Sequence, residues 1–243
     1  MNTIQANIDN LTSLWRTIGE RAHAYTSTKD FDHSVISYSQ WPNRLWFHHD
    51  LNEINIKAAK EVLQATSTRL VLPYWDIYGG QSYKLLEENG FEKQSEQIGM
   101  SLKLNQEYQK IGSLRTEKVS DESTALLWEK LFMQAFNYKI SHKLILSSYD
   151  EIDYLIAYHE NKTVGTGMVY SSENAVVGIH AMGIVPEMRR KGFAEKMMIN
   201  ILSQSARQGF KYATLQASSM GKGLYLKLGF EEEFILTNYA LQQ

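Results

Sequence analysis

The sequence predicts an α/β chain of the α+β type, made of two related halves that each carry a mixed, mostly antiparallel sheet flanked by helices. Three observations lead to this expectation. Strand-like and helical patterns alternate along the chain. Residues 177–208 show the pattern of a strand, a short basic turn with glycine, and a helix with apolar residues at i, i+4 and i+8. The same order of elements occurs earlier, in residues 44–104.

Length and composition exclude several classes of protein. The 243 residues suffice for one large domain or two small ones, and 43% hydrophobic residues can form a proper core. A net charge of −2 gives no indication of a nucleic-acid or membrane-surface protein. The polar first residues and the lack of a long apolar run lead us to expect a cytoplasmic protein. With no cysteine, disulfides and cysteine nucleophiles are excluded.

In the first half, a helix is predicted over residues 3–27, because its apolar residues share one broad face. The segments that follow are a strand at 44–48, a helix at 53–65, a strand at 70–75, a stretch at 83–92 and a strand at 98–104. Gly90-Phe91 corresponds to Gly229-Phe230, an offset of 139 residues (229 − 90). The same offset places one apolar helix row on another: Ile54, Ala58 and Val62 on Phe193, Met197 and Ile201. We therefore expect an internal repeat, with domains at residues 1–108 and 109–243.

The second half begins after a polar stretch at 105–113, which we interpret as the linker. A strand is expected at 114–119, and Ser120-Asp121-Glu122 offers N-cap residues to a helix. Two hairpins follow, the second with its turn at 171–174. The strand, turn and helix of residues 177–208 come next, the helix ending at Gln208-Gly209, and then a strand at 212–217.

The turn before the last long helix has residues that are typical of an anion-binding site. Arg189, Arg190 and Lys191 supply positive charge, Gly192 lets a ligand approach the backbone, and Ala194 leaves the turn uncrowded. The first N–H groups of the helix have no partner within it. An ordinary solvated basic turn is the alternative.

Two motifs together resemble a known family. Arg189-x-x-Gly192-x-Ala194 resembles the acyl-CoA pyrophosphate loop of the GCN5-related N-acetyltransferases (GNAT), and Leu224-Tyr225-x-x-Leu228-Gly229-Phe230 resembles the second motif of that superfamily. The resemblance implies transfer of an acetyl group from acetyl-CoA to a primary amine by direct attack. It also implies a set of cofactor-binding residues: Met182, Gly183, Ile184, Val185, Arg189, Arg190, Lys191, Gly192, Phe193, Ala194 and Ser218. Ser218 stands where the family often has asparagine.

The resemblance also implies catalytic roles. Tyr225 matches the general acid that protonates the leaving thiolate; packing beside Phe230 is the alternative. His180 matches a histidine of the arylalkylamine branch of the family and is suited to relay a proton; a purely structural histidine is the alternative. The histidines show no metal-ligand spacing, so we expect no metal.

The first half lacks these features. At the offset of 139 residues, Asp50, Glu53 and Asn55 replace the arginine, glycine and alanine of the loop, and Leu86 replaces the tyrosine. Carboxylates repel a phosphate, so we expect no CoA there. We expect instead that the first half completes the acceptor pocket, with Trp41 or Trp75 facing its partner. The sequence does not decide whether the acceptor is a small molecule or a peptide amine. It also leaves open whether the protein is a monomer or a homodimer. The alternative function is a non-catalytic acyl-CoA sensor.

Overall fold

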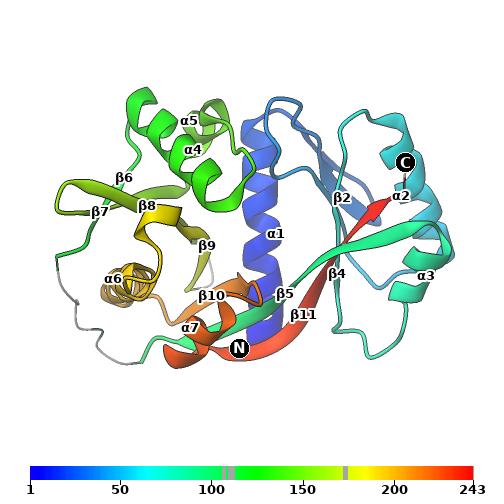
Figure 1. The fold of residues 1–243 in the computed structure, drawn as a ribbon. Helices are drawn as coiled ribbons and strands as arrows, with labels where there is room; N and C mark the ends of the chain where they lie inside the picture. The colour runs from blue at the N-terminus through cyan, green and yellow to red at the C-terminus, as the bar shows by residue number, and fades with distance from the viewer. Residues whose placement is uncertain (106–107, 109–112, 172–174, 243) are drawn as a thin grey trace.

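The computed structural model describes residues 1–105, 108, 113–171 and 175–242 (Figure 1). Most of the predicted linker at 105–113 and of the predicted turn at 171–174 lies outside these residues.

The described residues contain one large and one small sheet. The large sheet has eight strands, all neighbours antiparallel except β9 and β10. In spatial order they are β4 (Leu72–Trp75), β11 (Glu231–Leu241), β5 (Phe91–Lys103), β10 (Tyr212–Ala217), β9 (Val176–Ile184), β8 (Lys162–Ser171), β7 (Asp153–His159) and β6 (Arg115–Lys118). The small sheet is β1 (Tyr25–Ser27), β2 (Phe31–Ser34) and β3 (Arg44–Phe47). The mixed, mostly antiparallel character that the sequence predicts is confirmed for the large sheet.

The helices are α1 (Thr3–Arg21), α2 (Glu53–Ala65), α3 (Tyr83–Glu88), α4 (Glu122–Phe136), α5 (His142–Ser148), α6 (Phe193–Arg207) and α7 (Lys222–Lys227). The predicted helix at 3–27 is too long: α1 ends at Arg21, His23 turns the chain with a φ of 51°, and residues 25–27 form β1. The sequence did not indicate β1, β2 or α5, which are short and lack a periodic pattern.

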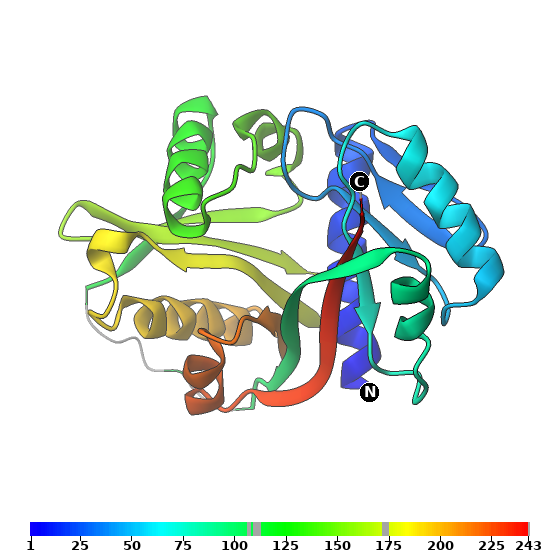
Figure 2. The ribbon, with the colours of Figure 1, turned by 45° about the vertical axis from the view of Figure 1, so that its right-hand side comes forward.

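Helices cover both faces of the large sheet. Side chains alternate along β7, because successive residues of a strand point to opposite faces. Leu155 and Ala157 join one core with α6, while Tyr154 and Ile156 join another with α1, α4 and α5. Figure 2 shows α6 on one side of these strands and α4 on the other.

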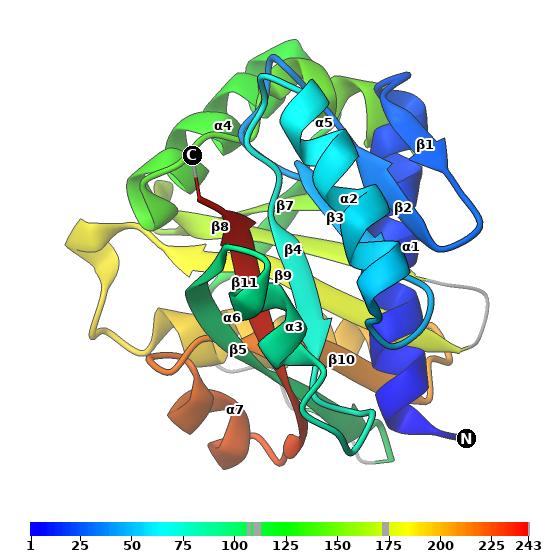
Figure 3. The ribbon, with the colours of Figure 1, turned by 90° about the vertical axis from the view of Figure 1, so that its right-hand side faces the viewer.

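Two long strands connect the halves. β5, from the first half, lies between β10 and β11 of the second, and β11 in turn pairs with β4 of the first half. In Figure 3 they cross behind α3, and Tyr239 of β11 belongs to the core that α2 and α3 cover. A second complete domain is therefore not shown, and the division at residues 108 and 109 stays a prediction.

The internal repeat is visible in the order of elements. The series β3–α2–β4–α3–β5 matches β9–α6–β10–α7–β11, and the parallel bridge between Arg44 and Val71 matches the parallel pairing of β9 with β10. Gly90 and Gly229 both follow a short helix with positive φ, 83° and 91°. The predicted helix register is wrong, since Ile54 is 81% exposed. The sheet under α2 selects a different face of that helix, with Asn55, Ile56 and Ala59 buried.

Because strands are exchanged between the halves, we expect the second half alone not to fold. A chain of residues 109–243 leaves β10 and β11 without β5, and exposes apolar side chains such as Leu215. β11 also loses β4, and the unpaired edges of β10 and β11 then favour aggregation. We expect this fragment to be insoluble or unfolded by circular dichroism and gel filtration. Cooperative unfolding of a soluble fragment would contradict the interdependence of the halves; co-expression with residues 1–108 is the control.

Candidate active site between the two halves

The site lies where two parallel strands separate. β10 pairs with β9 only at Tyr212–Thr214, opposite Val176–Gly178. Beyond Gly178 the two strands diverge, so this edge of β9 is not paired with β10. A bulge adds one residue to β9 opposite β8, between the pairs Met168–His180 and Thr166–Gly183, and Ala181 takes a φ of 49° there. Such a bulge re-aims the backbone that follows it.

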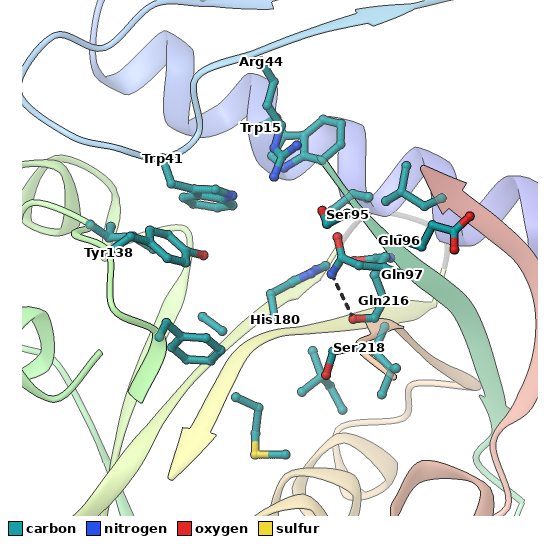
Figure 4. A pocket seen from close by; sticks show the side chains of 18 of the residues that line it. Trp15, Trp41, Arg44, Ser95, Glu96, Gln97, Tyr138, His180, Gln216 and Ser218 are labelled. Carbon is teal, nitrogen blue, oxygen red and sulfur yellow. Dashed lines mark hydrogen bonds between the residues drawn. The ribbon is translucent and has the colours of Figure 1, made fainter. Parts of the chain in front are cut away.

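A pocket of about 370 Å³ opens between the diverging strands (Figure 4). It is lined by residues of both halves of the chain. The second half contributes Phe136, Tyr138, Ile140, Ile179, His180, Ala181, Met182, Leu215, Gln216, Ser218, Tyr225 and Leu236. The first half contributes Leu11, Trp15, Trp41, Arg44, Ser95, Glu96 and Gln97. Of the tryptophans predicted to face the partner half, Trp41 lines the pocket. Trp75 does not line it and is buried in the apolar cluster that also contains Trp15.

The basic turn leads into α6 as the sequence predicts. Gly192 is the N-cap residue with a φ of 75°, and no side chain caps the first turn of the helix. The equivalent helix α2 is capped by Asn52, whose side chain accepts hydrogen bonds from the N–H groups of Ile54 and Asn55. The first half therefore fills its helix N-terminus with its own side chain, and the second half leaves its helix N-terminus open to an anion.

The three cations of the turn differ in their contacts. The Arg189 guanidinium donates to the carbonyls of Ile184 and Ala135, at 3.0 and 2.9 Å, so it braces the turn against β9 and α4. Lys191 donates to the carbonyl of Glu187 at 2.8 Å. Arg190 is exposed. Positive charge thus gathers at the mouth of the helix, with Arg189 held by backbone oxygens.

The remaining predicted cofactor residues fall into two groups. Ile184, Val185 and Phe193 have buried side chains, so only their backbone groups are open to a ligand. Met182, Gly183 and Ala194 are partly exposed, and Ser218 is exposed. A Cβ on Gly183 would lie 2.4 Å from the ring of Phe136, which shows how closely α4 packs on this end of β9.

Tyr225 lies on α7 and contributes to the pocket wall. Its ring packs edge-on against Phe230, with centroids 5.8 Å apart, so it has the packing role as well as access to the pocket. Burial raises the pKa of the Tyr225 phenol to about 12. The hydroxyl therefore carries its proton throughout the neutral range, as a proton donor must.

His180 is buried on β9, and α1 approaches it closely. Its Nε2 lies 3.2 Å from Asn10 Oδ1, which favours the tautomer with a proton on Nε2. Gly178 makes this contact possible, because a Cβ there would lie 1.9 Å from the same oxygen. Burial lowers the pKa of His180 to about 4, although a hydrogen bond with Gln216 opposes the shift. The imidazole is therefore neutral at physiological pH and accepts a proton only weakly.

The pKa of His180 makes the stability depend on pH. An unfolded histidine titrates near 6.5, so between about pH 6.5 and 4 the unfolded chain binds a proton that the folded chain does not. The contribution of His180 to the free energy of unfolding is thus full above pH 6.5. It falls by about 3 kcal/mol as the pH decreases toward 4. We expect urea unfolding to show this loss in the wild type and a smaller loss in His180→Gln. Parallel curves for the two proteins would contradict the neutral buried imidazole.

Sequence reasoning missed the polar network at the pocket. Gln216 donates to Asn7 Oδ1 at 2.6 Å, and Gln97 donates to the carbonyl of Gln216 at 3.3 Å. Asn238 joins Gln97 to Arg44 and so extends this network. Three of these residues belong to α1, β3 and β5, where no motif marks them; the buried asparagines on the apolar face of α1 were the available signal.

Comparison with known proteins identifies a domain in the second half of the chain. A family model described as an acetyltransferase (GNAT) domain matches residues 150–232. Residues 150–232 form a GNAT acetyltransferase domain. This GNAT domain runs from β7 to the start of β11 and contains the basic turn, His180 and Tyr225.

Solved structures extend the likeness to the rest of the fold. A GCN5-related N-acetyltransferase from Kribbella flavida matches with a TM-score of 0.71 and 11% identity, covering 94% of this chain and 95% of its own. A functionally unknown conserved protein from Staphylococcus epidermidis matches with a TM-score of 0.66 and 16% identity, over 90% and 93%. At these identities the likeness concerns the fold, which is GNAT-like over most of the chain. No curated protein matches the sequence.

Two further features bear on the sequence-based expectations. Within the described residues, no helix is both long and apolar enough to cross a membrane. In the same part of the chain, no group of three or more histidine, cysteine, aspartate or glutamate side chains could hold a metal ion.

Proposed function

We propose that the protein transfers an acetyl group from acetyl-CoA to a primary amine in the pocket between its halves. One observation carries the proposal: the open, basic N-terminus of α6 and the phenol of Tyr225 flank the same separated end of β9. The turn at Arg189–Ala194 would hold the pyrophosphate. The backbone at Met182–Val185 would align the pantetheine arm and donate to the thioester oxygen, an arrangement typically worth about 3 kcal/mol.

The chemistry is direct attack. The neutral amine forms a C–N bond to the thioester carbon, the C–S bond breaks, and the thiolate leaves with the bonding electrons. Tyr225 donates a proton to that thiolate, and the amide nitrogen releases its extra proton to water. A phenol that keeps its proton is suited to the donor role.

His180 fits positioning better than proton abstraction. With a pKa of about 4 it is a weak base, and its Nε2 is engaged with Asn10. We propose that the amine loses its proton to solvent before it binds, and that His180 and Asn10 hold the shape of the bulged strand.

An assay of CoA thiol release tests the proposal. Acetyl-CoA is mixed with the protein and a panel of primary amines, and acetylated products are identified by mass spectrometry. Thiol release that requires both the protein and an amine supports acyl transfer. Acetyl-CoA binding without any turnover would overturn it in favour of an acyl-CoA sensor.

A further inference from the structure

Arg44 occupies an unusual place at the wall of the pocket. In the part of the chain that the structure describes, no carboxylate pairs with it. Its Nη1 donates to Asn238 Oδ1 at 2.9 Å, its Nε is buried without a hydrogen-bond partner, and its guanidinium lies 4.8 Å above the ring of Trp15. Arg44 is half-buried, and a charge withdrawn from water without a counter-ion is costly, so a bound anion would stabilise it.

The neighbours of Arg44 fix the position of its side chain without neutralising it. Asn238 turns its oxygen to Arg44 because its nitrogen donates to Ser95 Oγ and Gln97 Oε1, at 3.2 and 3.3 Å. All of these partners are uncharged. Burial lowers the pKa of Arg44 to about 10, which still leaves the guanidinium charged at neutral pH.

The other charged or titratable side chains of the pocket do not balance Arg44. Glu96 is paired with Lys93 Nζ at 2.5 Å, and half of its side chain is exposed. His180 is neutral, and burial raises the pKa of Tyr138, which keeps its phenol uncharged. The pocket therefore carries one uncompensated positive charge.

The arrangement gives the pocket two different ends. In Figure 4, Arg44 and Trp15 lie at one end, Ser218 lies at the other, and His180 lies between them. The thioester belongs at the Ser218 end under the proposed function. Trp41 and Tyr138 form the wall opposite Gln97 and Gln216, so the space between the ends has an aromatic side and an amide side.

We propose that the acceptor is an amino acid-like molecule whose carboxylate binds Arg44 and whose amine lies at the far end of a spacer. This inference rests on the proposed function. A carboxylate accepts two parallel hydrogen bonds from a guanidinium and supplies the missing counter-charge. Because Arg44 and the thioester end are separated, the amine and the carboxylate are on different carbons of the acceptor, and a flat or apolar spacer fits the aromatic wall.

Matched amines test the inference. The first pair is para-aminomethylbenzoate and benzylamine, and the second is δ-aminovalerate and n-butylamine; in each pair a hydrogen replaces the carboxylate. We expect the wild type to prefer the acid of each pair by about 10- to 100-fold in kcat/KM, the range of a hydrogen bond to a charged group. Arg44→Met should abolish the preference, because only the acid of each pair loses its contact with the guanidinium.

Arg115→Met is the control variant, because Arg115 also lies over an aromatic ring, that of Tyr158 at 4.4 Å, but outside the pocket. It should keep the preference. Equal kcat/KM for both members of each pair, or a preference that survives Arg44→Met, would overturn the inference while the acyl transfer stands.

A binding measurement separates the inference from the proposed function. Trp15 and Trp41 line the pocket, so para-aminomethylbenzoate should quench the fluorescence of the wild type, and binding to Arg44→Met should be at least about tenfold weaker. If no amine is acetylated but this quenching depends on Arg44, the acetyltransferase proposal fails and the anion site survives. If neither occurs, both fail.

Discussion

Replacing Tyr225 by phenylalanine should lower kcat by roughly 10²-fold, the usual contribution of a positioned general acid. The ring is buried against Phe230, and phenylalanine keeps that packing, so the fold and the affinity for acetyl-CoA should be unchanged. Only the proton for the leaving thiolate is removed. The measurement is steady-state thiol release, with the KM for acetyl-CoA determined alongside kcat.

Tyr212→Phe is the matched control, because Tyr212 lies on β10 of the same domain but does not line the pocket. It should leave kcat within about twofold, as expected of a surface change away from the site. A Tyr225→Phe protein with normal kcat would assign Tyr225 to packing alone.

Replacing Gly192 by glutamate should abolish the binding of acetyl-CoA. The substitution places a carboxylate at the open N-terminus of α6, where a phosphate is to bind, and copies Glu53 of the first half. A bound ligand raises the melting temperature of the folded state. We therefore expect acetyl-CoA to raise the melting temperature of the wild type and to leave that of Gly192→Glu unchanged.

Gly209→Glu is the control for backbone strain. Gly209 follows the other end of α6 with a φ of 90°, and, as at Gly192, a Cβ would meet nothing within 4 Å. A side chain at such a φ costs about 1–2 kcal/mol at either position. Both variants should be less stable than the wild type, but Gly209→Glu should still respond to acetyl-CoA. A loss of response in both variants would point to strain rather than to a lost phosphate site.

The second half could be predicted from the sequence in some detail, because its signals are local. The pattern of apolar residues places α6 and β10 correctly, and Gly192 takes the positive φ that a glycine turn predicts. Short motifs are recognisable when all of their residues lie within one turn or helix, as do Arg189 to Ala194.

The exchange of β5 and β11 between the halves could not be predicted from the sequence. Pairing partners in a sheet are set by tertiary packing, and nothing in residues 91–103 indicates that they pair with residues 212–217. The acceptor end of the pocket was missed for the same reason. Arg44 and Asn238 are 194 residues apart, and they meet only because β3 and β11 pack at the same end of the fold.

The central claim is that the GNAT domain alone binds the cofactor while the first half contributes to the acceptor pocket. Calorimetric titration of acetyl-CoA into the wild-type chain tests it most directly. We expect one molecule bound per chain, because Asn52 caps the N-terminus of α2, whereas no side chain caps the N-terminus of the equivalent helix α6. Two molecules bound per chain, or no binding, would contradict this division of roles.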